Sequence, residues 1–433
     1  MKEYRTPKGT QDILPTEVAK WHKVEELIHS VCYYYGYNEL RTPIFEDTGV
    51  FKRENDSSDM VNKEMYTFSP NGEDSYTLRP EGTAGIVRSF VQHKLYGTGE
   101  LPAKLYYLGP MFRHERPQKG RYRQFVQFGI ENIGVKSPLI DAEMIALGVS
   151  VVKGLGLSQV KVLINTLGDK NSRDDYREKL KEYFKDSVSE LCGDCQRRYI
   201  QNPLRLLDCK VDGANPIMKS VPLMKNSLTD ESSKYFEQVL NALNSLGIEY
   251  EIDDKLVRGL DYYTDTVFEV VSTHPESGAQ ATVFAGGRYD NLVEYFGGPS
   301  LSGVGFAMGL ERLLILAEAE RVTLVDDEGK DVYVMSLGEV GSVPLELAIE
   351  CRANGYKAEF NCQSRGLKAQ FKAVDRHNAK VAIIVGEEEL KDNKVNIKNT
   401  VTGEQITVSI DDVISTIDSI LNMEDKQYET YTL

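Results

Sequence analysis

Two alternating runs, separated by a short basic segment, constrain the fold of this chain more than any other feature. Residues 104–115 read "KLYYLGPMFRHE" and residues 122–134 read "YRQFVQFGIENIG". Successive side chains of a strand point to opposite faces, so each run predicts a strand, and the segment "RPQKGR" predicts the turn between them. The sequence therefore predicts an antiparallel hairpin, with Arg113 on its first strand and more strands nearby.

The second strand of this hairpin has two different faces. One face carries Arg123, Phe125, Gln127, Gly129 and Glu131. The opposite face is mostly apolar and carries Gln124, Val126, Phe128 and Ile130. An amide and a carboxylate that point the same way, beside an arginine-bearing strand, indicate recognition of a cationic or amphoteric small molecule.

The hairpin is basic although the chain is acidic. Residues 112–125 hold five cations, whereas the 433 residues carry a net charge of −15. The overall field of such a chain repels phosphate, so any contact with a polyanion depends on a local basic patch. A guanidinium on a strand suits bidentate phosphate contact, and cations in a loop suit a larger polyanion. A solvated basic hairpin is the alternative, and charge alone does not decide between the two.

The length of the chain and the change in its pattern of strands and helices predict more than one domain. An amphipathic helix is expected over 17–35, and a short strand follows that ends near Pro43. Residues 170–235 are polar and helix-rich and are interpreted as an insertion. After a charged linker at 321–331, strands and helices alternate, which predicts a small α/β domain.

The expected helices of this last domain are 342–354, 364–378 and 410–421. Within 364–380, five cations recur at helical spacing and predict one basic stripe: Arg365, Lys368, Lys372, Arg376 and Lys380. A solvated charged face is the alternative interpretation. The sequence also lacks an apolar run long enough to cross a bilayer, and its first residues lack the apolar core of a signal peptide. We expect a cytoplasmic protein with no membrane contact.

Six cysteines in this length do not form a secreted disulfide framework. Cys192, Cys195 and Cys209 lie close together in sequence, but a structural zinc site takes four ligands, and the nearest histidines are His114 and His274. Zinc stays open as an alternative; reduced or loosely paired thiols are favoured, and no metal site is expected.

Glycines mark three further segments. In "GVGFAMGLERLL" (303–314) the spacing is one residue longer than the dinucleotide-binding pattern, so a strand leading into a helix is expected, with Arg312 in its first turns. In "AGGRYDNL" (285–292) the glycines allow close approach of a ligand, and "LVRGLDYYT" (256–264) places an arginine and two tyrosines at a turn. The sequence contains no GxxxxGK[ST], GxSxG or HExxH pattern.

These segments together resemble the histidyl-tRNA synthetase family, which belongs to the class II aminoacyl-tRNA synthetases. "YRTPKGTQDILP" is similar to the family's N-terminal segment, and residues 17–43 to motif 1, which builds a dimer interface. "FRHERPQKGRYRQF" resembles motif 2, "GVGFAMGLERLL" motif 3, and the segments at 256–264 and 285–292 two signatures of the histidine enzyme. The resemblance implies an α+β catalytic domain, an antiparallel sheet flanked by helices, over 1–325. A helical insertion at about 170–235, an α/β anticodon-binding domain at 331–423 and a tail at 424–433 complete the implied organisation.

The resemblance also implies a reaction. L-histidine and ATP give histidyl-adenylate and pyrophosphate, and the histidyl group then passes to the 3′ end of tRNA(His). Arg113 and Arg258 would hold the α-phosphate and Arg312 the γ-phosphate, with Arg121 in the ATP site as well. Magnesium would bridge the ATP phosphates, bound mainly by phosphates and water.

Two further sets of residues follow from the resemblance. Those implied to bind histidine are Glu81, Gly82, Thr83, Gln127, Glu131, Tyr262, Tyr263 and Tyr289. Those implied to bind tRNA are Arg116, Gln118, Lys119, Arg365, Lys368 and Lys372. The insertion is expected to pack over the acceptor arm of the tRNA, and the protein is expected to be a homodimer through the motif 1 region.

Two alternatives have different functions. The first is a catalytically silent relative that serves as the regulatory subunit of ATP phosphoribosyltransferase, which lacks the C-terminal domain and parts of the motifs. The second is an RNA-binding or sensor protein of the same fold. The intact arginines at positions 113, 258 and 312 and the C-terminal domain favour the enzyme.

Overall fold

The chain forms two compact units, Met1–Val325 and Asp326–Leu433, which we describe separately. The computed structural model describes residues 3–52, 58, 60–97, 99, 101–258, 262–325, 329–363 and 365–421. Asp261, part of the linker (326–328) and the expected tail at 424–433 lie outside the described residues. Among the residues described, every helix falls short of the length and apolar content that crossing a membrane requires.

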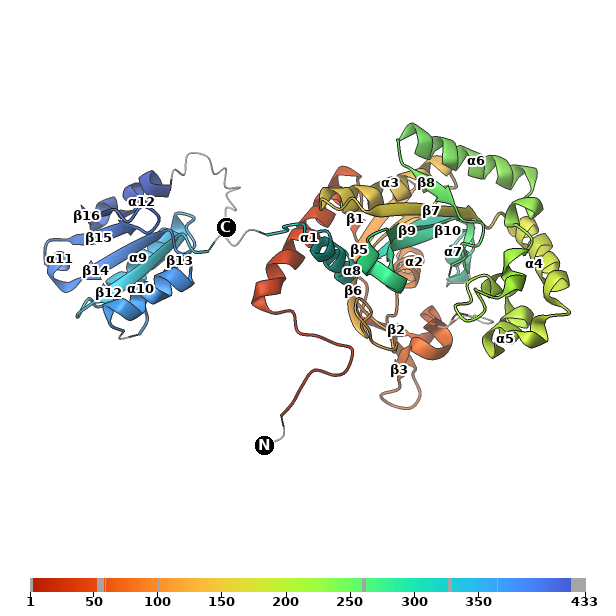
Figure 1. Cartoon of the computed structure of the whole chain (residues 1–433), viewed down its shortest axis with the longest axis horizontal. Coiled ribbons are helices and arrows are strands. Elements are labelled where there is room, and N and C mark those ends of the chain that lie inside the picture. Colours follow the sequence, from red (N-terminus) through yellow and green to blue (C-terminus); the bar gives the residue numbers. More distant parts are fainter. Residues whose placement is uncertain are drawn as a thin grey trace. The chain divides into compact units, whose positions relative to one another are not determined.

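An eight-stranded sheet organises the first unit (Figure 1), in the order β1-β5-β6-β11-β10-β9-β7-β8. Adjacent strands are antiparallel except for the parallel pairs β1–β5 and β7–β8. The strands are β1 (Asn38–Glu39), β5 (Ala103–Phe112), β6 (Gln124–Ile133), β7 (Val160–Thr166), β8 (Tyr250–Ile252), β9 (Thr264–Ser272), β10 (Thr282–Tyr289) and β11 (Gly303–Gly309). This mostly antiparallel sheet with flanking helices confirms the predicted fold class.

The predicted hairpin is β5 and β6, paired from Ala103↔Ile133 to Phe112↔Gln124. The prediction that Arg113 lies on the first strand is wrong by one residue, because β5 ends at Phe112. The Arg113 N–H still donates to the Arg123 carbonyl at 2.9 Å, but the His114 N–H turns away to the Glu64 carbonyl at 2.6 Å. Arg113 therefore begins the loop that the hairpin carries.

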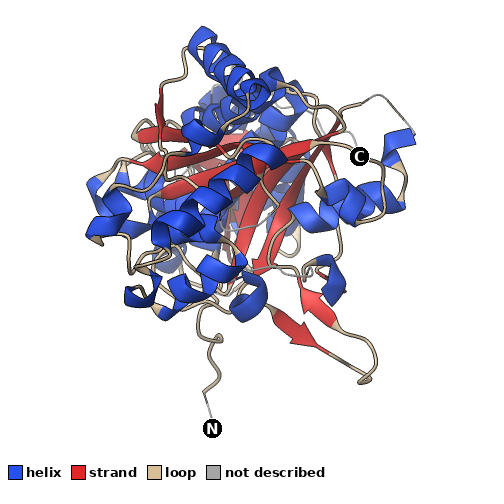
Figure 2. Cartoon of the chain, turned by 90° about the vertical axis from the view of Figure 1, so that its right-hand side faces the viewer, coloured by secondary structure: helices blue, strands red, loops and turns tan. Residues whose placement is uncertain are grey.

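Helices cover both faces of the sheet (Figure 2). The main apolar core lies under α1 (Pro15–Tyr34), α3 (Pro138–Gly154), α6 (Asp230–Ser245) and α8 (Leu310–Ala319). Helix α1 begins with a proline, which suits a first helical position, and buries residues at three- and four-residue steps: Trp21, Val24, Ile28 and Cys32. A second core lies under α2 (Thr83–Gln92) and α7 (Leu292–Tyr295) and includes Tyr262 and Tyr289. The polar residues described below are thus held by packed elements.

The insertion forms its own group of short helices beside the sheet, drawn in yellow-green in Figure 1. It contains α4 (Lys170–Phe184), α5 (Gly193–Gln201) and several 3₁₀ turns, and it has a separate apolar core. Helix α6 starts at Asp230, capped by the Thr229 side chain, and packs into the main core. The last residues of the range expected for the insertion, 230–235, therefore belong to a helix of the main body.

A small sheet of β2 (Phe45–Asp47), β4 (Tyr76–Leu78) and β3 (Tyr66–Phe68) completes the first unit. The second unit has a five-stranded sheet in the order β13-β12-β14-β15-β16. Its strands are β12 (Val332–Leu337), β13 (Ala358–Phe360), β14 (Val381–Gly386), β15 (Lys394–Asn399) and β16 (Gln405–Ser409). Its helices are α9 (Val343–Ala353), α10 (Leu367–Arg376), α11 (Glu387–Lys391) and α12 (Val413–Leu421). This mixed α/β unit agrees with the prediction.

Helix α10 is shorter than the predicted 364–378. Gly366 is its N-cap in an extended conformation, and the chain leaves the helix before Asn378, whose φ is +48°. The predicted five-residue basic stripe is therefore wrong at its ends: Arg365 precedes the helix, and Lys380 follows it, 3.9 Å from the Asp331 carboxylate. Lys368, Lys372 and Arg376 remain on the helix, and all three are exposed.

Candidate active site

A cavity of about 310 Å³ lies over the central strands of the sheet, between the β5–β6 loop, the start of α2 and the start of α8. Eleven of the predicted site residues line it: Glu81, Thr83, Arg113, Arg121, Gln127, Glu131, Arg258, Tyr262, Tyr263, Tyr289 and Arg312. They come from positions up to 231 residues apart (312 − 81) and meet only through the fold.

Glu131 is the buried carboxylate of one end of this cavity, with 1% of its surface exposed. Its two oxygens accept hydrogen bonds of 2.6 Å, one from the Thr83 hydroxyl and one from the Tyr289 hydroxyl. Burial raises the pKa of Glu131 to about 8, although both hydrogen bonds act to lower it. Burial therefore favours the protonated form of this carboxyl group in the free protein.

Gly305 makes room for this carboxylate. It faces Glu131 across the β6–β11 pair, and a Cβ atom at Gly305 would lie 2.1 Å from the Glu131 Oε2 atom. Gly305 in "GVGFAMG" thus permits close packing against a polar side chain, on a strand that leads into α8 as the sequence predicted. Any larger residue at this position would displace the Glu131 side chain.

Glu81 and Thr83 stand at the N-terminus of α2. The Glu81 carboxylate accepts hydrogen bonds from the backbone N–H groups of Thr83 at 2.6 Å and Ala84 at 3.0 Å, which caps the helix. Gln127 approaches from β6, and its amide oxygen accepts a hydrogen bond of 3.4 Å from the Tyr107 hydroxyl. This part of the wall therefore offers oxygen acceptors held in fixed positions.

Three tyrosines close this end of the cavity. The Tyr262 ring lies 4.8 Å from the Tyr263 ring and 5.8 Å from the Tyr289 ring, between centroids. Burial raises the pKa of Tyr263, so its hydroxyl keeps its proton and can donate as well as accept. The combination favours a planar, polar group at this end.

Another part of the cavity wall is cationic. The Arg113 guanidinium is held by a hydrogen bond of 2.7 Å from Nε to the Pro80 carbonyl and lies 5.3 Å from the centroid of the Phe125 ring. Arg312, at the start of α8, donates to the Thr282 carbonyl at 2.9 Å. Burial lowers the pKa of Arg312, and the nearby charges of Arg121 and Arg113 lower it further. Cations gathered this closely favour a polyanionic ligand.

Arg258 enters from a different segment. Its Nη1 atom donates to the Glu269 carboxylate at 3.0 Å. Its Nε atom is buried and has no hydrogen-bond partner within the described part of the chain. A buried donor without a partner costs free energy, so this position is available to an acceptor atom of a ligand.

The cavity wall contains three charged residues that the sequence did not predict. Glu115 pairs with Arg121, Glu311 accepts a hydrogen bond of 2.9 Å from the Val126 N–H, and Lys210 comes from the insertion. Burial raises the pKa of Glu311 to about 7. Glu115 and Glu311 are adjacent to motif arginines, which is the one local signal that could have pointed to them. Lys210 has no such signal, because its position depends on how the insertion folds.

The other predicted residues lie outside this cavity. Gly82 is behind the wall: a Cβ atom there would be 2.2 Å from the Tyr107 ring, so the glycine permits packing and does not line the site. Gln118 and Lys119 line a neighbouring cavity of about 300 Å³ that shares Arg312 with the first, and Arg116 is exposed on the same loop. The remaining three, Arg365, Lys368 and Lys372, are exposed in the second unit.

The first cavity thus combines a cationic end with an end of buried acceptors and tyrosines. This distribution of charges and acceptors suits a nucleoside triphosphate beside a small molecule that carries its own hydrogen-bond donors. Stabilisation by such preorganised charges favours reactions in which negative charge builds up on phosphate oxygens.

Comparison with known proteins agrees with this arrangement. The family model "Histidyl-tRNA synthetase" matches residues 9–313, and the model "Anticodon binding domain" matches residues 331–420. The histidine–tRNA ligase of Bacillus subtilis (strain 168) is 51% identical over 413 residues, 95% of this chain and 97% of that protein. That of Lysinibacillus sphaericus (strain C3-41) is 49% identical over 414 residues, 95% of this chain and 98% of that protein. The crystal structure of the apo histidyl-tRNA synthetase of S. aureus has a TM-score of 0.82 at 40% identity and covers 96% of this chain and 100% of that chain.

Proposed function

The chain belongs to the histidyl-tRNA synthetase family and is a histidine–tRNA ligase, and we propose that the 310 Å³ cavity is where it activates histidine. The observation that carries this proposal is that the buried carboxyl group of Glu131 and a cluster of arginines line the same cavity. The substrate would lie with its imidazole at the Glu131 end and its carboxylate toward the arginines, where the α-phosphate of ATP would meet it.

In the first step the histidine carboxylate attacks the α-phosphate, and pyrophosphate leaves. Arg113 and Arg258 would hold the α-phosphate from two sides, and Arg312 and Arg121 would meet the outer phosphates. The Nε of Arg258, which has no hydrogen-bond partner among the described residues, supports this assignment, because an α-phosphate oxygen would satisfy it. In the second step the terminal hydroxyl of tRNA(His) takes the histidyl group.

ATP enters this reaction with Mg²⁺ bound to its phosphates. The ion takes most of its ligands from phosphates and water and one or two from carboxylates. Glu115 and Glu311 line the cationic part of the cavity and offer oxygen ligands of the required kind. The ion would neutralise phosphate charge during the attack.

Recognition of the imidazole would depend on Glu131 and Tyr263, one at each ring nitrogen, with Tyr262 and Tyr289 enclosing the ring. Glu81, Thr83 and Gln127 would accept hydrogen bonds from the substrate ammonium. A pocket of this kind rejects analogues that leave its buried polar groups unpaired, by about 10⁴-fold or more. Gly82 would contribute indirectly, by allowing the Tyr107 ring to pack closely behind the cavity wall.

The tRNA would meet two exposed basic surfaces. The acceptor end would reach the loop that carries Arg116, Gln118 and Lys119, next to the cavity that holds Arg312. We assign 1–325 to the catalytic domain and 331–423 to the anticodon-binding domain, in which Arg365, Lys368 and Lys372 are exposed. The insertion would help to enclose the acceptor arm, and its Lys210 lines the first cavity.

We also propose a homodimer through the motif 1 region. Tyr33 and Tyr34, at the end of α1, are 79% and 80% exposed, and Phe45 is 51% exposed. Large apolar side chains that lie this open along one segment favour burial against a second copy. The six cysteines carry free thiols, which is typical of a reducing compartment and supports a cytoplasmic location together with the tRNA and ATP substrates.

ATP–pyrophosphate exchange with each of the twenty amino acids, without tRNA, tests the proposal. Exchange that depends on histidine alone is the expected result. No exchange with any amino acid, from well-folded protein, would support the regulatory-subunit or RNA-binding alternative.

A further inference from the structure

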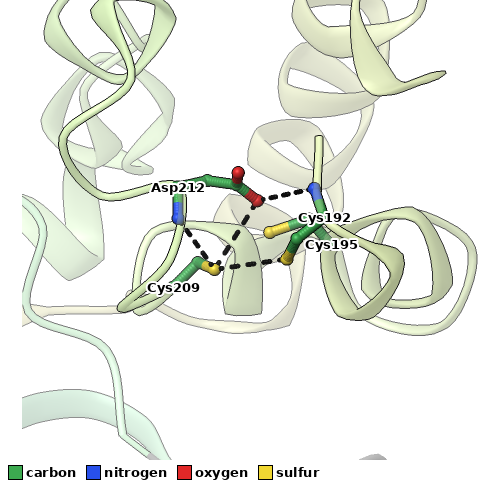
Figure 3. A group of neighbouring side chains, drawn as sticks. All are labelled: Cys192, Cys195, Cys209 and Asp212. Atoms are coloured by element: carbon green, nitrogen blue, oxygen red, sulfur yellow. Dashed lines mark hydrogen bonds between the residues drawn. The ribbon is translucent and has the colours of Figure 1, made fainter. Parts of the chain in front are cut away.

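Four potential metal ligands meet in the insertion, at a distance along the chain from any motif of the proposed reaction. Figure 3 shows Cys192, Cys195, Cys209 and Asp212 with their side chains pointing toward one another. Cys192 is the N-cap of α5 and Cys195 lies in its first turn, while Cys209 and Asp212 follow the 3₁₀ turn Pro203–Leu206. The sequence showed three thiols and no fourth cysteine or histidine; the fold brings in a carboxylate as the fourth group.

Two separations between the four ligand atoms match those around one tetrahedral ion. All four atoms lie within 4.8 Å of one another. The Cys192 and Cys209 sulfurs are 3.7 Å apart, and the Cys209 sulfur is 3.6 Å from the Asp212 Oδ2 atom. Tetrahedral zinc, with Zn–S of about 2.3 Å and Zn–O of about 2.0 Å, requires separations of about 3.7 Å between two sulfurs and about 3.5 Å between sulfur and oxygen.

Backbone groups already orient these ligands. The Cys192 N–H donates to the Asp212 Oδ2 atom at 3.0 Å, and the Asp212 N–H donates to the Cys209 sulfur at 3.3 Å. Outer hydrogen bonds of this kind fix the direction of metal ligands. Cys195, Cys209 and Asp212 are buried, and the half-buried Cys192 leaves a path by which an ion can enter.

Thiol packing alone does not account for the cluster. A disulfide would use two of the cysteines and leave a third thiol and a buried carboxylate. Within the described part of the chain, no lysine or arginine forms an ion pair with Asp212. A bound cation would supply the cationic partner that this carboxylate lacks among the described residues.

We propose that Cys192, Cys195, Cys209 and Asp212 bind one Zn²⁺ ion as a closed structural site. Three thiolates and one carboxylate fill the tetrahedron, so no position is left for a substrate. Soft thiolates select zinc over magnesium or calcium. The ion crosslinks the start of α5 to the turn at 209–212 and organises the apolar core of the insertion, which contains Cys195 and Cys209.

The site also has a consequence for the cavity of the proposed reaction. Cys209 is followed by Lys210, which lines that cavity. The ion would therefore hold the segment that presents Lys210 to the ATP site. This consequence rests on the proposed function; the metal site itself does not.

Metal analysis of the full-length protein tests the site directly. The protein is purified under reducing conditions, dialysed with zinc and then against metal-free buffer, and its zinc content is measured by mass spectrometry. Replacement by Co²⁺ supplies a spectroscopic signature, since tetrahedral cobalt thiolates absorb in the visible and add thiolate charge-transfer bands. We expect one ion per chain and a cobalt spectrum of tetrahedral thiolate type.

Three variants make the result specific. Cys192→Ser removes one ligand and leaves a good N-cap residue, so α5 should still form. Asp212→Asn removes the fourth ligand's charge, and Cys362→Ser, an exposed cysteine of the second unit, is the matched control. Cys192→Ser and Asp212→Asn should weaken zinc binding by at least about 10-fold and change the cobalt spectrum, whereas Cys362→Ser should not.

Two results would overturn the proposal: folded, reduced wild-type protein that retains no zinc, or a Cys192→Ser variant with unchanged affinity and cobalt spectrum. The consequence for Lys210 has its own measurement, the KM for ATP in pyrophosphate exchange before and after chelation. A chelated protein that loses its zinc but keeps its KM for ATP would refute the link to the active site alone. An inactive protein that still binds one zinc would refute the proposed function alone.

Discussion

The Tyr289 hydroxyl donates a hydrogen bond of 2.6 Å to the Glu131 carboxylate, and both side chains are buried in the wall of the cavity. The two residues are 158 positions apart and lie on β6 and β10, which are separated in the sheet by β11. Their contact fixes one Glu131 oxygen, and the Thr83 hydroxyl fixes the other. A carboxylate held in this way presents its remaining lone pairs to a ligand in one defined direction.

Glu131→Gln should therefore lower kcat/KM for histidine by about 10²-fold or more, because an amide cannot ionise to the form in which both oxygens accept hydrogen bonds when the substrate binds. Pyrophosphate exchange at varied histidine concentration measures the effect, and the KM for ATP should change little. Glu143→Gln, which alters a half-buried carboxylate paired with Lys104 away from the cavity, is the control. A variant with the histidine KM of the wild type would show that Glu131 does not contact the substrate.

The raised pKa of Glu131 predicts a dependence of stability on pH. The folded state holds the proton up to about pH 8, whereas an unfolded glutamate releases it near pH 4.5. The stability that this group contributes is therefore complete below about pH 4.5 and is lost as the pH rises through about 8. Glu131→Gln removes the dependence, so its melting temperature relative to wild type should rise between pH 5 and pH 9, by the equivalent of on the order of 2–4 kcal/mol. A difference that stays constant over this range, in thermal unfolding of the two ligand-free proteins, would contradict the prediction.

The buried Nε of Arg258 predicts a role in the transition state of adenylate formation. Arg258→Ala should lower the exchange rate by about 10²-fold or more and leave histidine binding nearly unchanged. Arg352→Ala is the matched control, since Arg352 is an exposed arginine of the second unit that also pairs with a glutamate, Glu359. Isothermal titration with histidine and exchange kinetics separate the two effects; a near-normal exchange rate would exclude the assigned role.

Substitutions in the exposed loop of the β5–β6 hairpin should impair the transfer of histidine to tRNA but not the formation of histidyl-adenylate. In Arg116→Ala/Lys119→Ala, aminoacylation of tRNA should fall by about 10-fold in kcat/KM at low salt, with a weaker salt dependence, because two phosphate contacts are lost. Pyrophosphate exchange without tRNA should stay within about 2-fold of wild type, since neither side chain lines the ATP cavity. Lys153→Ala/Lys234→Ala, which removes two exposed lysines on the main-core helices α3 and α6, is the control. Equal losses in both assays would place the loop in the first step.

Periodicity predicted the parts of the site that lie along single strands. The alternation of β6 placed Gln127 and Glu131 on one face, and the structure lines the cavity with both while Phe128 and Ile130 enter the main core. A two-residue period is a local property of the backbone, so it can be recognised without the rest of the fold.

The other parts of the site depend on packing between distant segments. Nothing near Lys210 or Asp212 indicates that one lines the cavity and the other meets three thiols, because each position is set by the turn that follows Pro203–Leu206. The predicted end of α10 is wrong for a related reason. The cations continue past Arg376 with helical spacing, but a positive φ at Asn378 ends the helix, and spacing alone does not report backbone conformation.

We expect the largest loss of stability in the first unit when either partner of the buried Arg288–Asp141 ion pair is replaced. Both are fully buried, and the Arg288 Nε atom donates to the Asp141 carboxylate at 3.0 Å. Arg288 also donates to Ser302 and thereby joins β10 to α3 and to the segment before β11. Removal of one partner leaves a buried charge unpaired, so Arg288→Met or Asp141→Leu should each cost about 3–5 kcal/mol of unfolding free energy.

The double variant distinguishes this cause from simple misfit. If the cost comes from the unpaired charge, Arg288→Met/Asp141→Leu should be more stable than either single variant, because both charges are gone and the space stays filled. Denaturant unfolding of the four proteins gives the coupling energy. Additive losses would mean that the two residues act through packing and not as an ion pair.

Tyr289 follows Arg288 on β10, so the single variants should also raise the KM for histidine. Recovery of that KM in the double variant would link the ion pair to the position of the Tyr289 hydroxyl.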